Sequence, residues 1–120
     1  MKEIIAIVRM NKLQETKRIL EDMGFPSFTA MKVMGRGKQK GFIHEFTHPI
    51  PVGNKDQDVK RFIPKRMIIL TVNDYEVDKI VDVIIKTNKT GNPGDGKIFV
   101  SEVIDAVRIR TGDTGEKAIL

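Results

Sequence analysis

Two apolar, β-branched runs, each followed by a helical pattern and then a second strand-like run, constrain the fold of this chain most strongly. Residues 3–9 (EIIAIVR) and 67–72 (MIILTV) have the composition of buried strands. Residues 27–33 (SFTAMKV) follow the first helix as a strand, and residues 97–110 (KIFVSEVIDAVRIR) follow the second as one long strand or a bent strand pair. The order β-α-β then β-α-β predicts an α+β fold, a ferredoxin-like double β-α-β sandwich with both helices on one face of an antiparallel sheet.

Each predicted helix has a start signal, an apolar face and a stop signal. An asparagine followed three residues later by Gln or Glu resembles a capping box, and a glycine follows the apolar face. In the first helix these residues are Asn11 and Gln14, then Leu13, Thr16, Leu20 and Met23 with Ile19 beside them, then Gly24. In the second helix they are Asn73 and Glu76, then Val77, Ile80, Val81 and Ile84, then Gly91.

Length and composition bound the class of protein. The chain has 120 residues, which fits one domain (residues 1–120) whose modest core would gain from oligomerisation. It has no cysteine, no apolar run near the roughly 18 residues that cross a bilayer, and no signal-peptide pattern at its start. We therefore expect a cytoplasmic protein without an integral membrane segment. The formal charge of +5 favours an anionic partner such as a nucleotide, a nucleic acid or an acidic protein face.

A long connection at residues 36–63 joins the two halves, and connections of this length are usually functional or mobile. It contains HEFTH at residues 44–48, which matches the HExxH signature of zinc peptidases. That signature needs a helix that puts His44 and His48 on one face, and a third ligand elsewhere. Two prolines follow the motif and its neighbours favour extended structure, so the sequence argues against catalytic zinc. Adventitious metal binding by the two histidines stays open.

The glycine-rich stretch GNPGDGK at residues 91–97 is the first candidate phosphate site. It matches the GxxxxGK of a P-loop, but Ile98 stands where the Mg²⁺-binding Ser or Thr belongs. The stretch also runs from helix to strand, opposite to a P-loop. Its glycines still let backbone amides converge on an anion, and Lys97 adds a charge. The alternative is an ordinary glycine-rich turn.

Two other basic pieces favour a phosphate ligand. Arg108 and Arg110 are two residues apart on a segment predicted to be extended, so they would point to the same side and suit a polyphosphate. Solvated surface arginines are the alternative. The stretch GRGKQKG at residues 35–41 offers bare amides and three basic side chains where the chain enters the long connection.

These pieces, in this order and spacing, resemble the PII signal-transduction proteins over nearly the whole chain. The resemblance is carried by KEIIAIVR with NKL, by GFPSFTAMKVMGRGKQKG, by TGNPGDGKIFV and by VRIRTG. It implies a homotrimer of ferredoxin-like subunits with ATP or ADP in each cleft between subunits. Residues of about 36–63 then correspond to the T-loop, the family's effector arm, and residues 90–97 to its phosphate-binding B-loop. Residues 107–112 correspond to a C-terminal arginine segment that the neighbouring subunit supplies.

The resemblance also implies ligand-binding residues. Positions that bind the nucleotide in the family are matched by Ile7, Thr29, Gly35, Gly37, Lys38, Gly94, Asp95, Gly96, Lys97, Arg108 and Arg110. Positions that bind 2-oxoglutarate are matched by Gln39, Lys40, Gly41 and Lys65. In the family Gln39 would also ligate Mg²⁺ when 2-oxoglutarate binds beside the ATP phosphates, and Lys65 would pair with the 2-oxoglutarate carboxylate. Lys38 stands where many members have arginine.

The T-loop places the chain within the family. It is longer than usual and has no tyrosine, because Tyr75 lies in the second helix, so uridylylation of the loop is not expected. These features resemble the nitrogenase-associated branch, especially the longer of its two paralogues. That branch works as a pair of paralogous PII proteins and inhibits dinitrogenase when fixed nitrogen is plentiful, with 2-oxoglutarate relieving the inhibition. We therefore expect a regulator rather than an enzyme, working through a ligand-controlled order–disorder switch of the T-loop.

Two alternatives to this function stay open at the level of sequence. One keeps the family and changes the target to an ammonium channel or a nitrogen-assimilation enzyme. The other is an RNA-binding ferredoxin-like module, suggested by KGFIHEF at residues 40–46. Ile43 and His44 disrupt the aromatic spacing that stacking on bases requires, so no nucleic-acid partner is expected.

Overall fold

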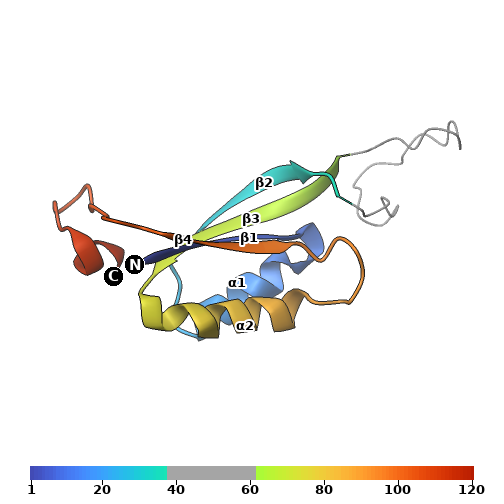
Figure 1. The fold of residues 1–120 in the computed structure, drawn as a ribbon, viewed down its shortest axis with the longest axis horizontal. Helices are drawn as coiled ribbons and strands as arrows, with labels where there is room; N and C mark the ends of the chain where they lie inside the picture. The colour runs from blue at the N-terminus through green and yellow to red at the C-terminus, as the bar shows by residue number, and fades with distance from the viewer. Residues whose placement is uncertain (38–61) are drawn as a thin grey trace, which may run out of the picture.

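The computed structural model describes residues 1–37 and 62–120 of the chain. The strands and α-helices along these residues are β1 (Lys2–Arg9), α1 (Leu13–Asp22), β2 (Thr29–Gly35), β3 (Ile63–Val72), α2 (Val77–Asn88) and β4 (Lys97–Glu102). Short 3-10 turns precede α1 (Met10–Lys12) and α2 (Asp74–Glu76), and a third lies at Gly115–Ile119. Figure 1 shows the sheet running lengthwise above the two helices.

The described strands form one antiparallel sheet in the order β2-β3-β1-β4. The two central strands, β1 and β3, are aligned so that Lys2 lies opposite Val72 and Arg9 lies opposite Lys65. Strand β4 flanks β1 with Ile7 opposite Lys97, and β2 flanks β3 on the other side. Each half of the chain thus contributes a β-α-β unit with one strand of the other half between its own strands. The predicted ferredoxin-like α+β fold is confirmed.

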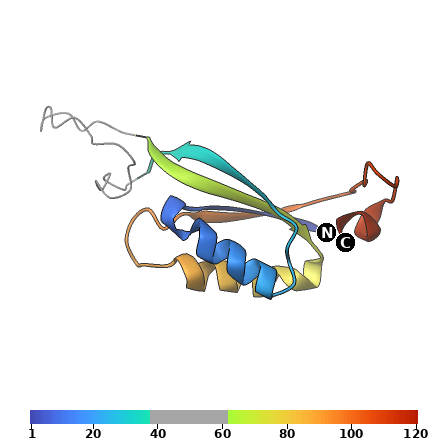
Figure 2. The same ribbon diagram turned by 180° about the vertical axis from the view of Figure 1, so that it is seen from behind.

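Both helices cover the same face of the sheet (Figures 1 and 2). Because successive side chains of a strand point to opposite faces, alternate residues of β1 and β3 meet the helices. The buried core consists of Ile4, Ala6, Val8, Ile68, Leu70 and Val72 from the sheet, and of Leu20, Ile80 and Ile84 from the helices. The helical faces predicted from the 3.6-residue period are therefore the faces that pack.

The other face of the sheet is apolar as well, although no helix of the described residues covers it. Ile5, Ile7, Met67 and Ile69 on this face are half-buried, and Phe99 is 51% exposed. An apolar sheet face of this kind is normally covered by another layer.

The two helix starts differ from each other. The Asn73 N–H donates to the Glu76 carboxylate at 3.2 Å, as predicted, and holds the turn that opens α2. Asn11 does not cap α1, because the 3-10 turn Met10–Lys12 places it inside the turn and leaves Lys12 at the N-cap position without a side-chain cap. The predicted capping box at Asn11 is wrong, and Arg9 rather than Asn11 precedes the first turn.

Two strand boundaries also differ from the prediction. Strand β2 spans Thr29–Gly35 instead of residues 27–33. Strand β4 ends at Glu102, so the predicted continuation to residue 110 is wrong. The physical reason is pairing: Glu102 lies opposite Lys2, and beyond β1 there is no further strand residue for Ile104 and its successors to pair with. After Glu102 the chain forms a turn closed by an isolated bridge between Val107 and Thr114.

No helix among the described residues is long and apolar enough to cross a membrane.

Candidate functional site

The segment from Thr90 to Lys97, called here the phosphate loop, connects the end of α2 to β4. Three of its glycines have φ angles in the left-handed region, and Gly96 is the most constrained of them at +105°. A Cβ atom on Gly96 would lie 1.7 Å from the Ile7 carbonyl oxygen. Because no side chain fits there, the loop can press its backbone directly against β1. Its last residue, Lys97, then enters the sheet opposite Ile7.

Asp95 holds the phosphate loop together from within. Its carboxylate accepts hydrogen bonds from the Thr90 N–H at 2.8 Å and the Gly91 N–H at 2.9 Å, and also from the Thr90 hydroxyl. Burial opposes ionisation of this carboxyl, but the bonds from Thr90, Gly91 and Arg9 outweigh it and lower the pKa of Asp95 to about 2. Asp95 is therefore a fixed negative charge inside the loop, and its side chain points toward its own backbone.

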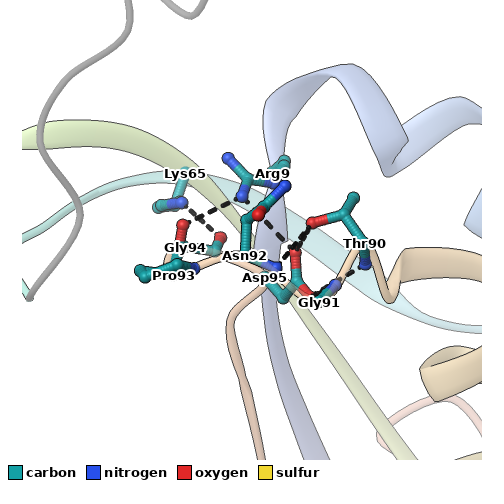
Figure 3. A network of polar contacts seen from close by, with 8 residues as sticks. All are labelled: Arg9, Lys65, Thr90, Gly91, Asn92, Pro93, Gly94 and Asp95. Carbon is teal, nitrogen blue, oxygen red and sulfur yellow. Dashed lines mark hydrogen bonds and ion pairs between the residues drawn. The ribbon is translucent and has the colours of Figure 1, made fainter.

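Arg9 and Lys65 attach the phosphate loop to the sheet (Figure 3). They lie opposite each other on β1 and β3 and are only 8% and 7% exposed. Arg9 donates to the Pro93 carbonyl at 3.1 Å and to the Asp95 carboxylate at 3.4 Å, and Lys65 donates to the Gly94 carbonyl at 2.7 Å. Two buried cations side by side would be unfavourable alone, and the loop's carboxylate and carbonyl oxygens help to stabilise them.

This attachment orients the remaining groups of the loop. The carbonyl groups of Pro93 and Gly94 face the two cations, while the N–H groups of Gly94 and Gly96 have no acceptor within the described parts of the chain. Lys97 is exposed and likewise has no hydrogen-bond or ion-pair partner among the residues described. The loop thus offers unused donors beside a lysine, which is a set of groups suited to an anion.

A cavity of 390 Å³ lies against the loop, between α2 and the start of β4. It is lined by four residues that the sequence predicted to bind nucleotide and by seven that it did not predict to do so. The first set is Ile7, Asp95, Gly96 and Lys97, and the second is Val8, Val81, Ile84, Ile85, Asn88, Lys89 and Ile98. Of the apolar members, Val81 and Ile84 come from the core-facing side of α2, and their helical period marked them only as core. Ile85 of α2 is 45% exposed, and Val8 and Ile98 belong to β1 and β4.

The other nucleotide residues suggested by the sequence are spread over the chain. Thr29 begins β2 and pairs with Ile69, well along the sheet from the loop, whereas Gly35 ends β2. A Cβ on Gly35 would lie 3.4 Å from the Lys65 side chain, so Gly35 is close to the attachment point of the loop. Gly37 is exposed and follows β2. Lys38, Gln39, Lys40 and Gly41 lie outside the described residues, as do HEFTH and the other residues of the long connection through residue 61.

Arg108 and Arg110 do not meet the phosphate loop within one chain. The segment that carries them, residues 107–112, lies beyond β4 at the opposite end of the sheet (Figures 1 and 2). The prediction that they share one side of an extended segment is wrong, because residues 109–111 form a turn that separates the two side chains. Arg110 is exposed, and Arg108 is half-buried against Asp113 and the C-terminal residues.

Arg9 is the loop-anchoring residue of the candidate site that sequence reasoning missed. The available signal was a charged residue at the end of an otherwise apolar strand, EIIAIVR. That signal is weak, because a strand end normally places an arginine in solvent. Burial of Arg9 depends on a loop more than eighty residues later in the chain.

Comparison with known proteins agrees with this architecture. The family described as "Nitrogen regulatory protein P-II" matches residues 1–113. "Nitrogen fixation nifHD region GlnB-like protein 2" of Methanothermobacter marburgensis is 52% identical over 121 residues, covering 99% of this chain and 100% of the relative. The protein of the same name from Methanococcus maripaludis is 46% identical over 122 residues, again covering 99% and 100%.

A solved structure gives the same answer for the fold. The crystal structure of Arabidopsis thaliana PII bound to citrate matches with a TM-score of 0.75 and 31% identity, over 98% of this chain and 90% of that chain. The family match covers most of the sequence, and the relatives are similar along their whole length. The chain therefore belongs to the nitrogen regulatory protein P-II family, in the branch named for nitrogen fixation regions.

Proposed function

We propose that this protein reports nitrogen status by binding ATP or ADP at the phosphate loop and 2-oxoglutarate beside it, and that it controls a target protein through the long connection. The observation that carries the proposal is the attachment of the phosphate loop to β1 and β3 by Arg9 and Lys65. The Gly94 and Gly96 N–H groups and the Lys97 side chain have no partner among the described residues and would be available to an anion. We infer a regulator and not an enzyme, in keeping with the family's description.

The phosphate loop suits a polyphosphate in both shape and charge. Amide donors that are fixed by the surrounding contacts need little reordering when an anion arrives. Each charge-assisted hydrogen bond to a phosphate oxygen contributes about 1.5–3 kcal/mol. Lys97 would supply such bonds at the rim of the 390 Å³ cavity, whose apolar wall distinguishes a nucleotide from inorganic phosphate. Asp95 would act within the loop and not on the ligand.

A complete site requires a second copy of the chain. The segment of residues 107–112 lies at the far end of the sheet from the phosphate loop (Figure 1), so its arginines from one copy would complete the loop of another. The uncovered apolar sheet face, with Ile5, Ile7 and Phe99, offers a surface for such an assembly. We propose a homotrimer with one nucleotide site at each boundary between copies.

An effector with carboxylate groups would bind beside the phosphates. Lys65 is buried, cationic and in contact with the Gly94 carbonyl, so a carboxylate at Lys65 would sense the state of the loop directly. The Arabidopsis PII of the comparison is bound to citrate, which is also a polycarboxylate. We propose 2-oxoglutarate at this position, with Mg²⁺ bridging it to ATP. Gln39 would be the protein's ligand to the metal, and Lys40 and Gly41 would bind 2-oxoglutarate.

The target protein is proposed from the branch of the P-II family to which this chain belongs. Relatives that are 46–52% identical are named for nitrogen fixation regions, which favours dinitrogenase over an ammonium channel or an assimilation enzyme. When fixed nitrogen is plentiful, the protein would inhibit dinitrogenase. Binding of ATP and 2-oxoglutarate would relieve this inhibition. The coupling must come from the different affinity of the ligands for two states of the connection, typically about 1–3 kcal/mol. A paralogous PII chain could be required in the inhibitory complex.

Calorimetry with a matched pair of variants tests the nucleotide site. Wild type should bind Mg·ATP and Mg·ADP more tightly than adenosine, because the loop recognises phosphate. Lys97→Ala should weaken ATP binding by roughly 10- to 100-fold, in line with the loss of one charged hydrogen bond. Lys86→Ala, an exposed lysine on α2, removes the same charge away from the loop and should leave affinity unchanged. Equal affinity for ATP and adenosine would refute the proposed site.

The effector and the target need separate experiments. 2-Oxoglutarate should bind to the ATP-loaded protein and only weakly without ATP, and Gln39→Ala should abolish this dependence. A pull-down of dinitrogenase should succeed without 2-oxoglutarate and fail in the presence of ATP and 2-oxoglutarate. Capture of an ammonium channel instead of dinitrogenase would leave the proposed nucleotide site standing and would change only the proposed target.

A further inference from the structure

The two arginines beyond β4 are in different states, although the sequence treats them alike. Arg110 is exposed and has no hydrogen-bond or ion-pair partner among the described residues. The Arg108 side chain is 27% exposed and has three acceptors. Only Arg108 is therefore already occupied by groups of its own chain.

The acceptors of Arg108 come from the residues that follow it. One terminal nitrogen donates to the Asp113 carboxylate at 3.3 Å, and the other donates to the carbonyl oxygens of Lys117 at 2.9 Å and Leu120 at 2.7 Å. Backbone bonds close the same turn, from the Arg108 N–H to the Asp113 carbonyl and from the Gly112 N–H to the Arg108 carbonyl. Residues 113–120, called here the C-terminal turn, thus fold back onto the guanidinium.

These acceptors have the chemistry of a phosphate. A carboxylate oxygen and two backbone oxygens surround the two terminal nitrogens of the guanidinium, and these nitrogens are the ones that bind a phosphate by two parallel bonds. A guanidinium has five N–H donors, and the nitrogen that serves Lys117 and Leu120 has both of its hydrogens engaged. A phosphate that binds the same two nitrogens must displace the C-terminal turn or the Asp113 carboxylate.

We propose that the C-terminal turn is an internal competitor for the phosphate-binding edge of Arg108, so that nucleotide binding through this arginine requires release of the turn. This inference rests on the proposed function, because it assumes that Arg108 meets the phosphates held by a neighbouring copy's loop. It assigns unequal roles to the two arginines. Arg110 is available for the first contact, and Arg108 joins only after the turn has opened.

The effect expected from one partly exposed ion pair is modest. Removing the charge of Asp113 frees Arg108 from its carboxylate partner and should raise the affinity for Mg·ATP by about two- to fivefold. The gain must disappear in an Arg108→Ala background, where no guanidinium is left to release. Asp22→Asn is the matched control, since Asp22 pairs with Arg18 on the surface of α1 and its loss changes the net charge equally.

The test is calorimetric titration of Mg·ATP into full-length wild type, Asp113→Asn, Asp22→Asn, Arg108→Ala and the Arg108→Ala/Asp113→Asn double variant. Tighter binding by Asp113→Asn alone supports the inference. Unchanged or weaker binding by Asp113→Asn, with wild type binding normally, overturns it and leaves the proposed function standing. If neither wild type nor any variant binds ATP, the proposed function fails, and the competition with it.

Amide hydrogen exchange gives a second readout that does not depend on a substitution. The N–H of Gly112 is bonded to the Arg108 carbonyl and that of Gly115 to the Ala106 carbonyl, so both amides should be protected in the free protein. Saturating Mg·ATP should increase their exchange by several-fold, whereas adenosine should not. Stronger protection with ATP would mean that the turn supports Arg108 instead of competing with phosphate, and would overturn the inference.

Discussion

Gly96 is the residue at which the structure makes its sharpest energetic prediction. A methyl group added there would lie 1.7 Å from the Ile7 carbonyl oxygen, whereas Cβ atoms in proteins essentially never approach another heavy atom to less than 3.0 Å. The loop and β1 would have to separate by more than about 1 Å. That movement acts on the pairing of Ile7 with Lys97, which closes the β1–β4 ladder.

The magnitude follows from two separate costs. An alanine at φ of +105° is strained by about 1–2 kcal/mol in the left-handed region. Losing the adjacent backbone hydrogen bonds and the contact of the loop with β1 costs about 2–3 kcal/mol more. Gly96→Ala should therefore lower the free energy of unfolding by about 3–5 kcal/mol, a large part of the stability of a domain of this size.

Gly91 provides a control within the same loop. It has a φ of +88° as well, but a Cβ atom there would meet nothing within 4 Å. Gly91→Ala should therefore cost only the backbone strain of about 1–2 kcal/mol. Urea denaturation of wild type and the two variants measures the difference directly. If Gly96→Ala and Gly91→Ala fall within about 0.5 kcal/mol of each other, the close approach of the loop to β1 is not what the structure depicts.

Three further predictions concern the contacts around the loop and one helix cap. The pKa of Asp95 is lowered to about 2, so its ionised carboxylate contributes about 1–2 kcal/mol to the free energy of unfolding. This contribution is complete above the ordinary aspartate pKa and is lost as the pH falls from about 4 to 2, so the difference in unfolding free energy between wild type and Asp95→Asn, measured in urea, should shrink over that range. A difference that does not change with pH would contradict the assignment. Arg9→Ala leaves the Pro93 carbonyl and the Asp95 carboxylate without this donor. It should lower the free energy of unfolding by about 2–3 kcal/mol and should speed amide exchange in residues 90–96. Arg18→Ala, on the surface of α1, should change neither the stability nor the exchange rates. Glu76→Ala removes the acceptor for the Asn73 N–H and should lower the thermal midpoint by an amount corresponding to about 0.5–1 kcal/mol; no change would mean that the turn before α2 is held by other contacts.

Much of the fold follows from sequence periodicity, because the repeating unit of each element is local. The apolar runs that became β1 and β3 and the 3.6-residue pattern of Ile80 and Ile84 each identify a buried face without reference to the rest of the chain. The cap at Asn73 could be predicted for the same reason, since the donor and the acceptor are three residues apart. The cap predicted at Asn11 failed because a 3-10 turn was inserted between β1 and α1, a choice that capping residues alone do not determine.

The predictions that failed involve partners distant in sequence. Residues 103–110 have the composition of a strand, but the register of β1 with β4 leaves no strand of the described residues beside them, and Ile104 and Ile109 are fully exposed. Arg9 and Lys65 show the same effect in the site. Their burial and their hydrogen bonds depend on a loop that the sequence places far from both, so neither residue's contact with the loop could be read from its local surroundings.

The central claim is that the phosphate loop of one copy and the arginines of another form a single nucleotide site, and subunit mixing tests it most directly. Lys97→Ala and Arg110→Ala chains should each bind ATP weakly when alone. After the two are unfolded and refolded together, about a quarter of the boundaries in random trimers would join an intact loop to an intact arginine. We predict that ATP binding at wild-type affinity reappears in that fraction of sites. Mixed protein that binds no better than its two parents would contradict the account.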